Sequence, residues 1–129
     1  MLVLGIESSC DETAAAVVEG GHIVRSNVVA SQDELHIEYG GVVPEIASRA
    51  HVERILPVIE QALTQANVSP KDLDGVAVGN RPGLIGALLV GVTAAKSIAW
   101  SLDLPFVAVD HVLAHLYAPN LGATQIQYP

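Results

Sequence analysis

Basic side chains and cysteines are scarce in this sequence. Six Lys and Arg stand against 14 Asp and Glu, which gives a formal net charge of −8 at pH 7. Because nucleic-acid phosphates are bound mainly by Lys and Arg, the chain alone makes a poor nucleic-acid surface. A single cysteine, Cys10, excludes an internal disulfide framework and suits a reducing compartment. Any role with RNA would need most of its basic surface from elsewhere.

Long apolar runs and aromatic residues are also rare. No apolar stretch reaches the roughly 18 residues that a membrane span needs, and the N-terminus has no basic region typical of an export signal. We therefore expect a soluble, cytoplasmic protein without membrane contact. Only 4% of the 129 residues are aromatic while 50% are hydrophobic, so the core of this single domain must consist of Ala, Val, Leu and Ile.

Apolar runs and turn signals predict a regular succession of elements. Three strands are expected first, over residues 2–6, 14–18 and 22–29, followed by a polar loop excursion over 31–43. The remaining elements are expected to be a helix over 44–66, a strand over 73–78, a helix over 84–100, a strand over 104–109 and a helix over 111–121. Pro57 lies inside the first long helix and predicts a kink or a break near Leu56. The helix over 84–100 is nearly all apolar, which requires burial in the core or against a partner.

The predicted order is β-β-β-α-β-α-β-α, which favours an α/β fold with a mixed sheet and helices on its faces. This order resembles the ribonuclease-H-like lobe of actin, sugar kinases and heat-shock ATPases. Such proteins normally carry two lobes with a nucleotide between them. Residues 1–129 have room for one lobe, so a second lobe is expected to be absent.

Two histidines four residues apart form the first candidate site. Asp110 is a plausible N-cap for the last helix, on which His111 and His115 would share one face and could bind a single metal ion. Two surface histidines on an amphipathic helix are the alternative. The helix of zinc proteases has Glu directly after the first histidine as general base, whereas this chain has Val112 there, which argues against protease chemistry.

The turn after the first strand forms a second candidate site. Ser9, Asp11 and Glu12 bring a hydroxyl and two carboxylates into one turn, where they could face an anion, a metal ion or a water molecule. Simple capping of the turn is the alternative. Gly83 and Gly86, at a strand-to-helix junction, could admit a substrate to a helix N-terminus or allow close packing; the sequence leaves both open.

A loose polar cluster surrounds the start of the first long helix. It contains His36, Tyr39, Glu45, Arg49 and His51. A solvated helix start explains these residues well enough, and we interpret them in that way.

Four sequence blocks together resemble one family. They are GIESSCDET (5–13), HIEYGGVVPEIASRAHVERI (36–55), RPGLIGALLVG (81–91) and HVLAH (111–115). In order and spacing they resemble the TsaD family, which older annotation calls glycoprotease or O-sialoglycoprotein endopeptidase. The resemblance covers essentially the whole chain, and the blocks are far more specific jointly than singly.

The resemblance implies a two-lobed protein of the actin and heat-shock-ATPase type. Members of this family transfer a threonylcarbamoyl group from its adenylate to the exocyclic amine of the adenosine beside a tRNA anticodon. Bacterial members work with a catalytically inactive paralogue, TsaB, and an ATPase, TsaE, and the complete family protein binds ATP or threonylcarbamoyl-adenylate. Binding of tRNA is expected only in the complete assembly.

The resemblance also assigns roles to residues. His111 and His115 match the family's metal-binding pair for iron or zinc, whose third ligand, an Asp, lies in the half that is absent. Ser9, Asp11 and Glu12 match the nucleotide-facing turn, with Asp11 or Glu12 as candidate general base. The loop with Pro82, Gly83 and Leu84 matches a substrate-binding segment, although Arg81 stands where the family usually has Gly.

Family members are about twice as long as this chain, so the resemblance implies an N-terminal lobe that is inactive by itself. The helices over 44–66 and 84–101 correspond to the surface that pairs with TsaB or with a second copy. A non-catalytic, TsaB-like pairing module is the alternative function, and a metallo-endopeptidase is a weaker one. Metal bound at His111 and His115 would favour the enzyme, and a metal-free stable dimer would favour the module.

Overall fold

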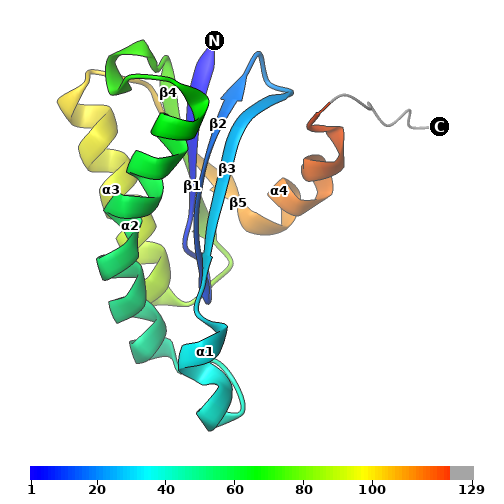
Figure 1. Cartoon of the computed structure of the whole chain (residues 1–129), viewed down its shortest axis with the longest axis vertical. Helices are drawn as coiled ribbons and strands as arrows, with labels where there is room; N and C mark the ends of the chain where they lie inside the picture. Colours follow the sequence, from blue (N-terminus) through cyan, green and yellow to red (C-terminus); the bar gives the residue numbers. More distant parts are fainter. Residues whose placement is uncertain (123–129) are drawn as a thin grey trace.

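The computed structural model describes residues 1–122. Five strands form one sheet in the order β3-β2-β1-β4-β5 (Figure 1). The strands are β1 (Leu2–Glu7), β2 (Glu12–Glu19), β3 (Ile23–Ser31), β4 (Gly75–Arg81) and β5 (Phe106–Asp110). The helices are α1 (Asp33–His36), α2 (Pro44–Ala66), α3 (Ile85–Ser101) and α4 (His111–Tyr117), with short 3-10 turns at Ile37–Tyr39, Pro70–Asp72 and Ala118–Asn120.

The sheet is mixed, which confirms the predicted fold class. β2 pairs antiparallel with β1 and with β3, whereas β1, β4 and β5 run parallel. The carboxyl ends of the three parallel strands therefore lie at one edge of the sheet, where β2 also begins. In the α/β folds that such sheets build, ligands bind at this edge.

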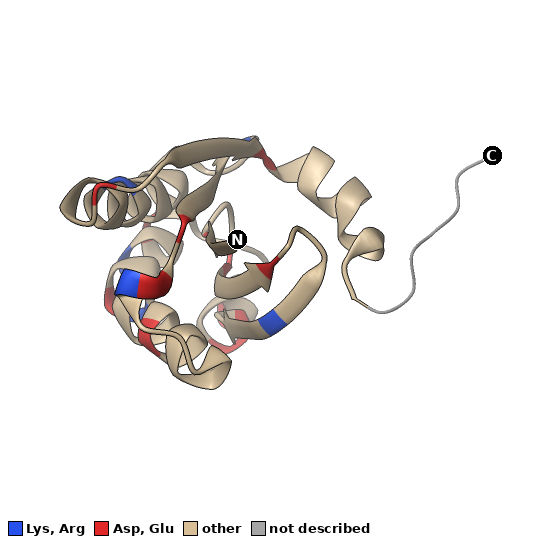
Figure 2. Cartoon of the chain, turned by 90° about the horizontal axis from the view of Figure 1, so that it is seen from above, with Lys and Arg blue, Asp and Glu red and all other residues tan. Residues whose placement is uncertain are grey.

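Helices α2 and α3 cover one face of the sheet (Figure 1). Alternate side chains of the central strands, including Leu4, Ile6, Val76 and Val78, are buried under them. The core is aliphatic, as the shortage of aromatic residues predicts. Helix α4 lies on the other side of the sheet from α2 and α3 (Figure 2), and none of its residues is buried. No helix within residues 1–122 has the length and apolar character needed to cross a bilayer.

Helices α2 and α4 each differ from the expectation in one respect. α2 continues through Pro57 without a break, because Pro57 and Glu53, whose carbonyl loses its helical partner, both lie on the exposed face where water can hydrogen-bond. α4 ends at Tyr117 rather than near residue 121. Pro119 has no N–H to continue the helical hydrogen bonds, and the chain passes into a 3-10 turn.

Three glycines allow close packing, which is one of the two interpretations left open for Gly83 and Gly86. A Cβ on Gly86 would collide with the Ser48 hydroxyl of α2, and a Cβ on Gly83 would lie 2.7 Å from the Ser9 carbonyl oxygen. A Cβ on Gly91 would collide with the hydroxyl of Ser8. These positions serve contact between α3, α2 and the turn after β1.

Replacing Gly91 by Ala is expected to lower the free energy of unfolding by about 1–3 kcal/mol, because overpacking forces buried groups apart. The buried Ser8 hydroxyl donates to the carbonyl of Ala87 at 2.8 Å and accepts the N–H of Gly91 at 3.1 Å. Urea unfolding of the two proteins measures the change. Gly41→Ala is the matched control, because a Cβ at Gly41 meets nothing within 4 Å; equal losses in both variants would contradict this account.

The solvated interpretation of the polar cluster is wrong for its two histidines. His36 is buried, with Nε2 3.0 Å from Gln32 Oε1, and its Nδ1 accepts the N–H of Val43. His51 is fully buried, with Nδ1 2.8 Å from the Thr13 hydroxyl and Nε2 2.9 Å from the carbonyl oxygen of Cys10. These bonds tie α2 to β2 and to the turn after β1.

The rest of the cluster is exposed, as interpreted from the sequence. Glu45 and Arg49 form an ion pair at 2.8 Å on the surface of α2, with both side chains more than three-quarters exposed. Tyr39 is also exposed. An exposed pair of this kind contributes little to stability.

Candidate functional site

Helix α4 begins at the edge where the parallel strands end. Asp110, the last residue of β5, caps it: its Oδ1 accepts the N–H of Val112 at 2.9 Å and that of Leu113 at 3.2 Å. This is the predicted N-cap. The cap fixes where the helix starts, and therefore which way the first histidine faces.

His111 and His115 meet on one face of α4, as their spacing predicts. Their Nε2 atoms are 3.0 Å apart, and the ring centroids are 4.4 Å apart with the planes at 84°. Two facing nitrogens at this distance require a proton on one of them or a shared cation between two lone pairs. The pair is open to solvent, since His115 is exposed and His111 only half-buried.

Two residues of the first strand and its turn hold the inner histidine. Nδ1 of His111 lies 3.2 Å from Glu7 Oε2 and 3.2 Å from the Ser9 hydroxyl. The N–H of Ser9 donates to Glu7 Oε1 at 2.5 Å. Burial acts to raise the pKa of Glu7, but the hydrogen bonds from Ser9 and His111 outweigh it and hold that pKa below its ordinary value.

Sequence reasoning missed Glu7. It stands in the quoted block GIESSCDET, but nothing in its neighbourhood links it to a histidine 104 residues away. The position of Glu7 in the sequence was one available signal. A carboxylate at the end of an apolar parallel strand lies at the edge of an α/β sheet where ligands bind.

The histidine pair can supply two ligands to a metal ion. Imidazole nitrogens are common ligands of zinc and iron, and both Nε2 atoms converge from one helix face. Within residues 1–122, however, no group of three or more His, Cys, Asp or Glu side chains could hold a metal ion. The described residues therefore offer two ligands to a metal ion at this position, fewer than a complete metal site needs.

The predicted carboxylates lie at the same end of the sheet as the pair, and no hydrogen bond joins them to it. Asp11 is half-buried and Glu12 is exposed where β2 begins, at the same edge of the sheet. The partners of His111 are Glu7, Ser9 and His115. Of the predicted turn residues, the structure brings only Ser9 to the histidines.

Cys10, in the same turn, is not an activated thiol. Although Cys10 is exposed, slight desolvation and the neighbouring Asp11 carboxylate raise the pKa of its thiol above the ordinary value. Nucleophilic cysteines need the opposite shift, because the thiolate is the reactive form.

The loop from Arg81 to Leu84 packs on the same turn. The N–H of Leu84 donates to the carbonyl of Ser9 at 2.8 Å, and the bond between Arg81 and Pro82 is cis. The N–H groups of Ser9 and Leu84 are thus already paired, so neither is available to a phosphate. The exposed Arg81 reaches Asp110, with Nε 3.7 Å from Oδ2, and places a cation beside the histidine helix.

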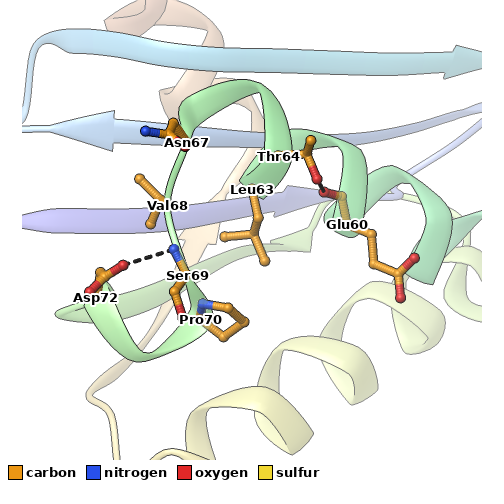
Figure 3. Close-up of a pocket in the computed structure, with 8 residues that line it drawn as sticks. All are labelled: Glu60, Leu63, Thr64, Asn67, Val68, Ser69, Pro70 and Asp72. Carbon is orange, nitrogen blue, oxygen red and sulfur yellow. Dashed lines mark hydrogen bonds between the residues drawn. The ribbon is translucent and has the colours of Figure 1, made fainter.

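A separate hollow of about 650 Å³ lies at the C-terminal end of α2, shown in Figure 3. It precedes β4, so it lies at the opposite end of that strand from the histidines. Its lining residues are Glu60, Leu63, Thr64, Asn67, Val68, Ser69, Pro70 and Asp72. Ser69 and Asp72 cap each other there, with the Ser69 N–H 2.8 Å from Asp72 Oδ2, so these two polar residues stabilise the turn itself.

Comparison with solved structures supports the fold. YeaZ from Pseudomonas aeruginosa superposes with a TM-score of 0.68 at 19% identity, over 93% of this chain and 50% of YeaZ. RuvC from T. thermophilus, solved in complex with a Holliday junction substrate, superposes with a TM-score of 0.52 at 15% identity, over 90% of this chain and 68% of RuvC. At these identities the likeness concerns the fold alone.

Comparison with curated sequences identifies the family. A protein of Treponema denticola named tRNA N6-adenosine threonylcarbamoyltransferase is 60% identical over 129 residues, which are 100% of this chain and 38% of the relative. The protein of that name from Listeria innocua is 62% identical over 128 residues, 99% of this chain and 37% of the relative. The chain thus spans well under half the length of these relatives. The family model TsaD, described as tRNA N6-adenosine threonylcarbamoyltransferase, matches residues 23–129, and the chain therefore belongs to the TsaD family.

Proposed function

We propose that this chain is the N-terminal lobe of a transferase that attaches a threonylcarbamoyl group to the adenosine beside a tRNA anticodon, with threonylcarbamoyl-adenylate as donor. The observation that carries the proposal is the convergence of His111 and His115 at the carboxyl edge of the parallel strands, with Glu7 and Ser9 behind them. Family membership and the names of the relatives support the same reaction. The enzyme acts in the cytoplasm.

We propose that His111 and His115 hold one iron or zinc ion through Nε2. A metal ion there supplies Lewis-acid stabilisation of the charge that develops when the adenylate reacts. The further ligand and the second lobe come from outside the described residues, so the chain by itself is inactive. Ser9 supports the site through its contact with His111 Nδ1.

We propose that the turn after β1 and the loop after β4 bind the nucleotide part of the donor. Ser9, Asp11 and the segment Pro82–Gly83–Leu84 form this surface, and the contact between Leu84 and Ser9 makes the two segments one unit. Asp11 or Glu12 accepts the proton of the attacking amine, because both lie where β2 starts, at the same edge as the histidines. Carboxylates suit this role when they lie within reach of the amine.

We propose that α2 and α3 form the partner surface, for a TsaB-like paralogue or a second copy of the chain. The two helices run side by side in the same direction, and Ser48 of α2 lies against Gly86 of α3. One turn further on, Val52 and Leu89 are 65% and 56% exposed. A TsaE-like ATPase and tRNA join only in the complete assembly. The net charge of −8 makes this chain a poor surface for tRNA phosphates, so other subunits supply the basic residues that tRNA needs.

Other exposed apolar residues of α3 favour the second candidate, a non-catalytic pairing module. Ile85, at the start of α3, is 76% exposed and Trp100, near its end, is 89% exposed, so both ends of the helix offer apolar surface to a partner. The chain shares its fold with YeaZ from Pseudomonas aeruginosa. The metallo-endopeptidase alternative has less support, because Val112 stands where that mechanism needs a carboxylate.

A chimaera tests the transferase proposal. This chain replaces the matching 129 residues of the Treponema denticola relative, and threonylcarbamoyl transfer to tRNA is measured with the partner proteins of that organism. We expect an active chimaera that loses transfer by about 100-fold or more when His111 and His115 are both replaced by Ala. An active chimaera that tolerates both replacements would support the pairing module instead.

A further inference from the structure

The two oxygens of the Glu7 carboxylate face two different groups. Oε1 accepts the N–H of Ser9, and Oε2 lies 3.2 Å from Nδ1 of His111. An ionised carboxylate has no proton to donate. The hydrogen bond to Oε2 therefore requires the proton of the neutral His111 ring on Nδ1, which leaves the lone pair on Nε2.

The position of the Ser9 hydroxyl is consistent with a proton on Nδ1 of His111. It lies 3.2 Å from the same Nδ1, and a hydroxyl oxygen can accept a share of the Nδ1 proton. On the opposite side of the ring, Nε2 of His111 faces Nε2 of His115 at 3.0 Å. Glu7 is thus behind the ring and is not a ligand candidate itself.

Gly79 leaves room for the side chain of Glu7, because it has no side chain of its own. It lies in β4, beside the end of β1, and a Cβ on it would collide with Oε2 of Glu7. Gly79 is buried and its φ lies outside the left-handed region. The absence of a side chain, rather than an unusual backbone conformation, is what this position requires.

From this geometry we infer that Glu7 is a positioning residue, which holds His111 in its Nδ1–H tautomer so that the Nε2 lone pair faces His115 and a shared metal ion. The inference rests on the proposed metal site. Carboxylates behind a ligating histidine fix the tautomer and the ring orientation in known metal sites, and their loss typically costs 10–100-fold in metal affinity.

Glutamine cannot replace Glu7 in this role. Two donors, the Ser9 N–H and the His111 Nδ1–H, need two acceptors, and an amide offers one oxygen and one NH2 group. If the NH2 group faces His111, the ring relieves the clash by moving its proton to Nε2, which blocks metal ligation. If it faces Ser9, the turn loses its hydrogen bond instead.

The test compares the 129-residue chain with its Glu7→Gln variant, with histidine side chains labelled with 15N and each preparation free of metal. Nitrogen shifts report which ring nitrogen carries the proton. We expect an unprotonated Nε2 on His111 in the original chain and a proton on Nε2 in the variant, with Zn2+ affinity about 10–100-fold lower by calorimetry. Gly79→Ala, which displaces the carboxylate without changing charge, should act in the same direction.

Glu19→Gln is the matched control. Glu19 ends β2 of the same sheet, and its Oε2 accepts a hydrogen bond from Arg25 at the surface. It pairs with Leu2 at the start of β1, so it lies at the opposite end of the sheet from the histidine helix. The Glu19→Gln variant should have the same His111 tautomer and the same Zn2+ affinity as the original chain. A proton on Nε2 of His111 in the original chain, or equal Zn2+ affinity in the Glu7→Gln variant, would overturn the inference. If the original chain shows the expected tautomer and no Zn2+ binding, the metal proposal fails while the tautomer assignment of Glu7 is supported.

Discussion

Replacing His115 by Ala is expected to weaken Zn2+ binding to the chain by about 100-fold or more. Loss of a residue that only hydrogen-bonds to a metal ligand typically costs about 10–100-fold in affinity, and loss of a ligand itself should cost at least as much as the upper end of that range. His115 carries one of the two Nε2 atoms that converge on α4, at 3.0 Å. Its side chain is exposed, so removing it costs little stability and leaves His111 in place on Glu7. Isothermal calorimetry with Zn2+ measures the affinity of both proteins.

His22→Ala is the control for this prediction. His22 is an exposed histidine in the turn between β2 and β3, and its ring hydrogen-bonds to the carbonyl of Gly20. Its loss should leave Zn2+ affinity unchanged. If the two variants lose affinity equally, the ion binds histidines nonspecifically and the pair on α4 is not a site.

Replacing His51 by Leu is expected to destabilise the fold by about 2–3 kcal/mol, because a buried polar group that loses its partner keeps its desolvation cost. The fully buried Thr13 hydroxyl would lose its bond to Nδ1, and the Cys10 carbonyl would lose its bond to Nε2. The second bond anchors the turn that carries Ser9 and Asp11. The effect therefore links the core to the site.

Urea unfolding, followed by circular dichroism, measures this loss. The matched control is His22→Leu, since exposed substitutions away from special features usually change stability by about 0.5 kcal/mol or less. A loss for His51→Leu no larger than for the control would show that water replaces both hydrogen bonds and that the turn needs no anchor.

Elements with local signals were predictable from the sequence. Continuous aliphatic runs gave the strands at 2–6 and 73–78, and the position of Asp110 before a histidine pair gave the cap and the shared face of α4. The order of elements then led to the mixed sheet, because few topologies accommodate three strands followed by helix–strand alternation. These features depend on neighbours within a few residues.

Features that depend on distant partners were not predictable. His51 looks like a surface residue of an amphipathic helix until Thr13 and Cys10 are seen to surround it. Glu7 has no local signal for its contact with His111, and Gly86 gives no sign that Ser48 fills the space of its missing side chain. Pro57 predicts a break from local rules, yet the exposure of that face lets the helix continue.

The most direct test of the account is to follow all five histidines of the chain by NMR while Zn2+ is added. The account predicts that the Nε2 signals of His111 and His115 change together at equal Zn2+ concentrations, while those of His22, His36 and His51 stay where they are. Signals of the other three histidines that move with the pair, or a pair that does not respond at all, would contradict a metal site at the carboxyl edge of the sheet.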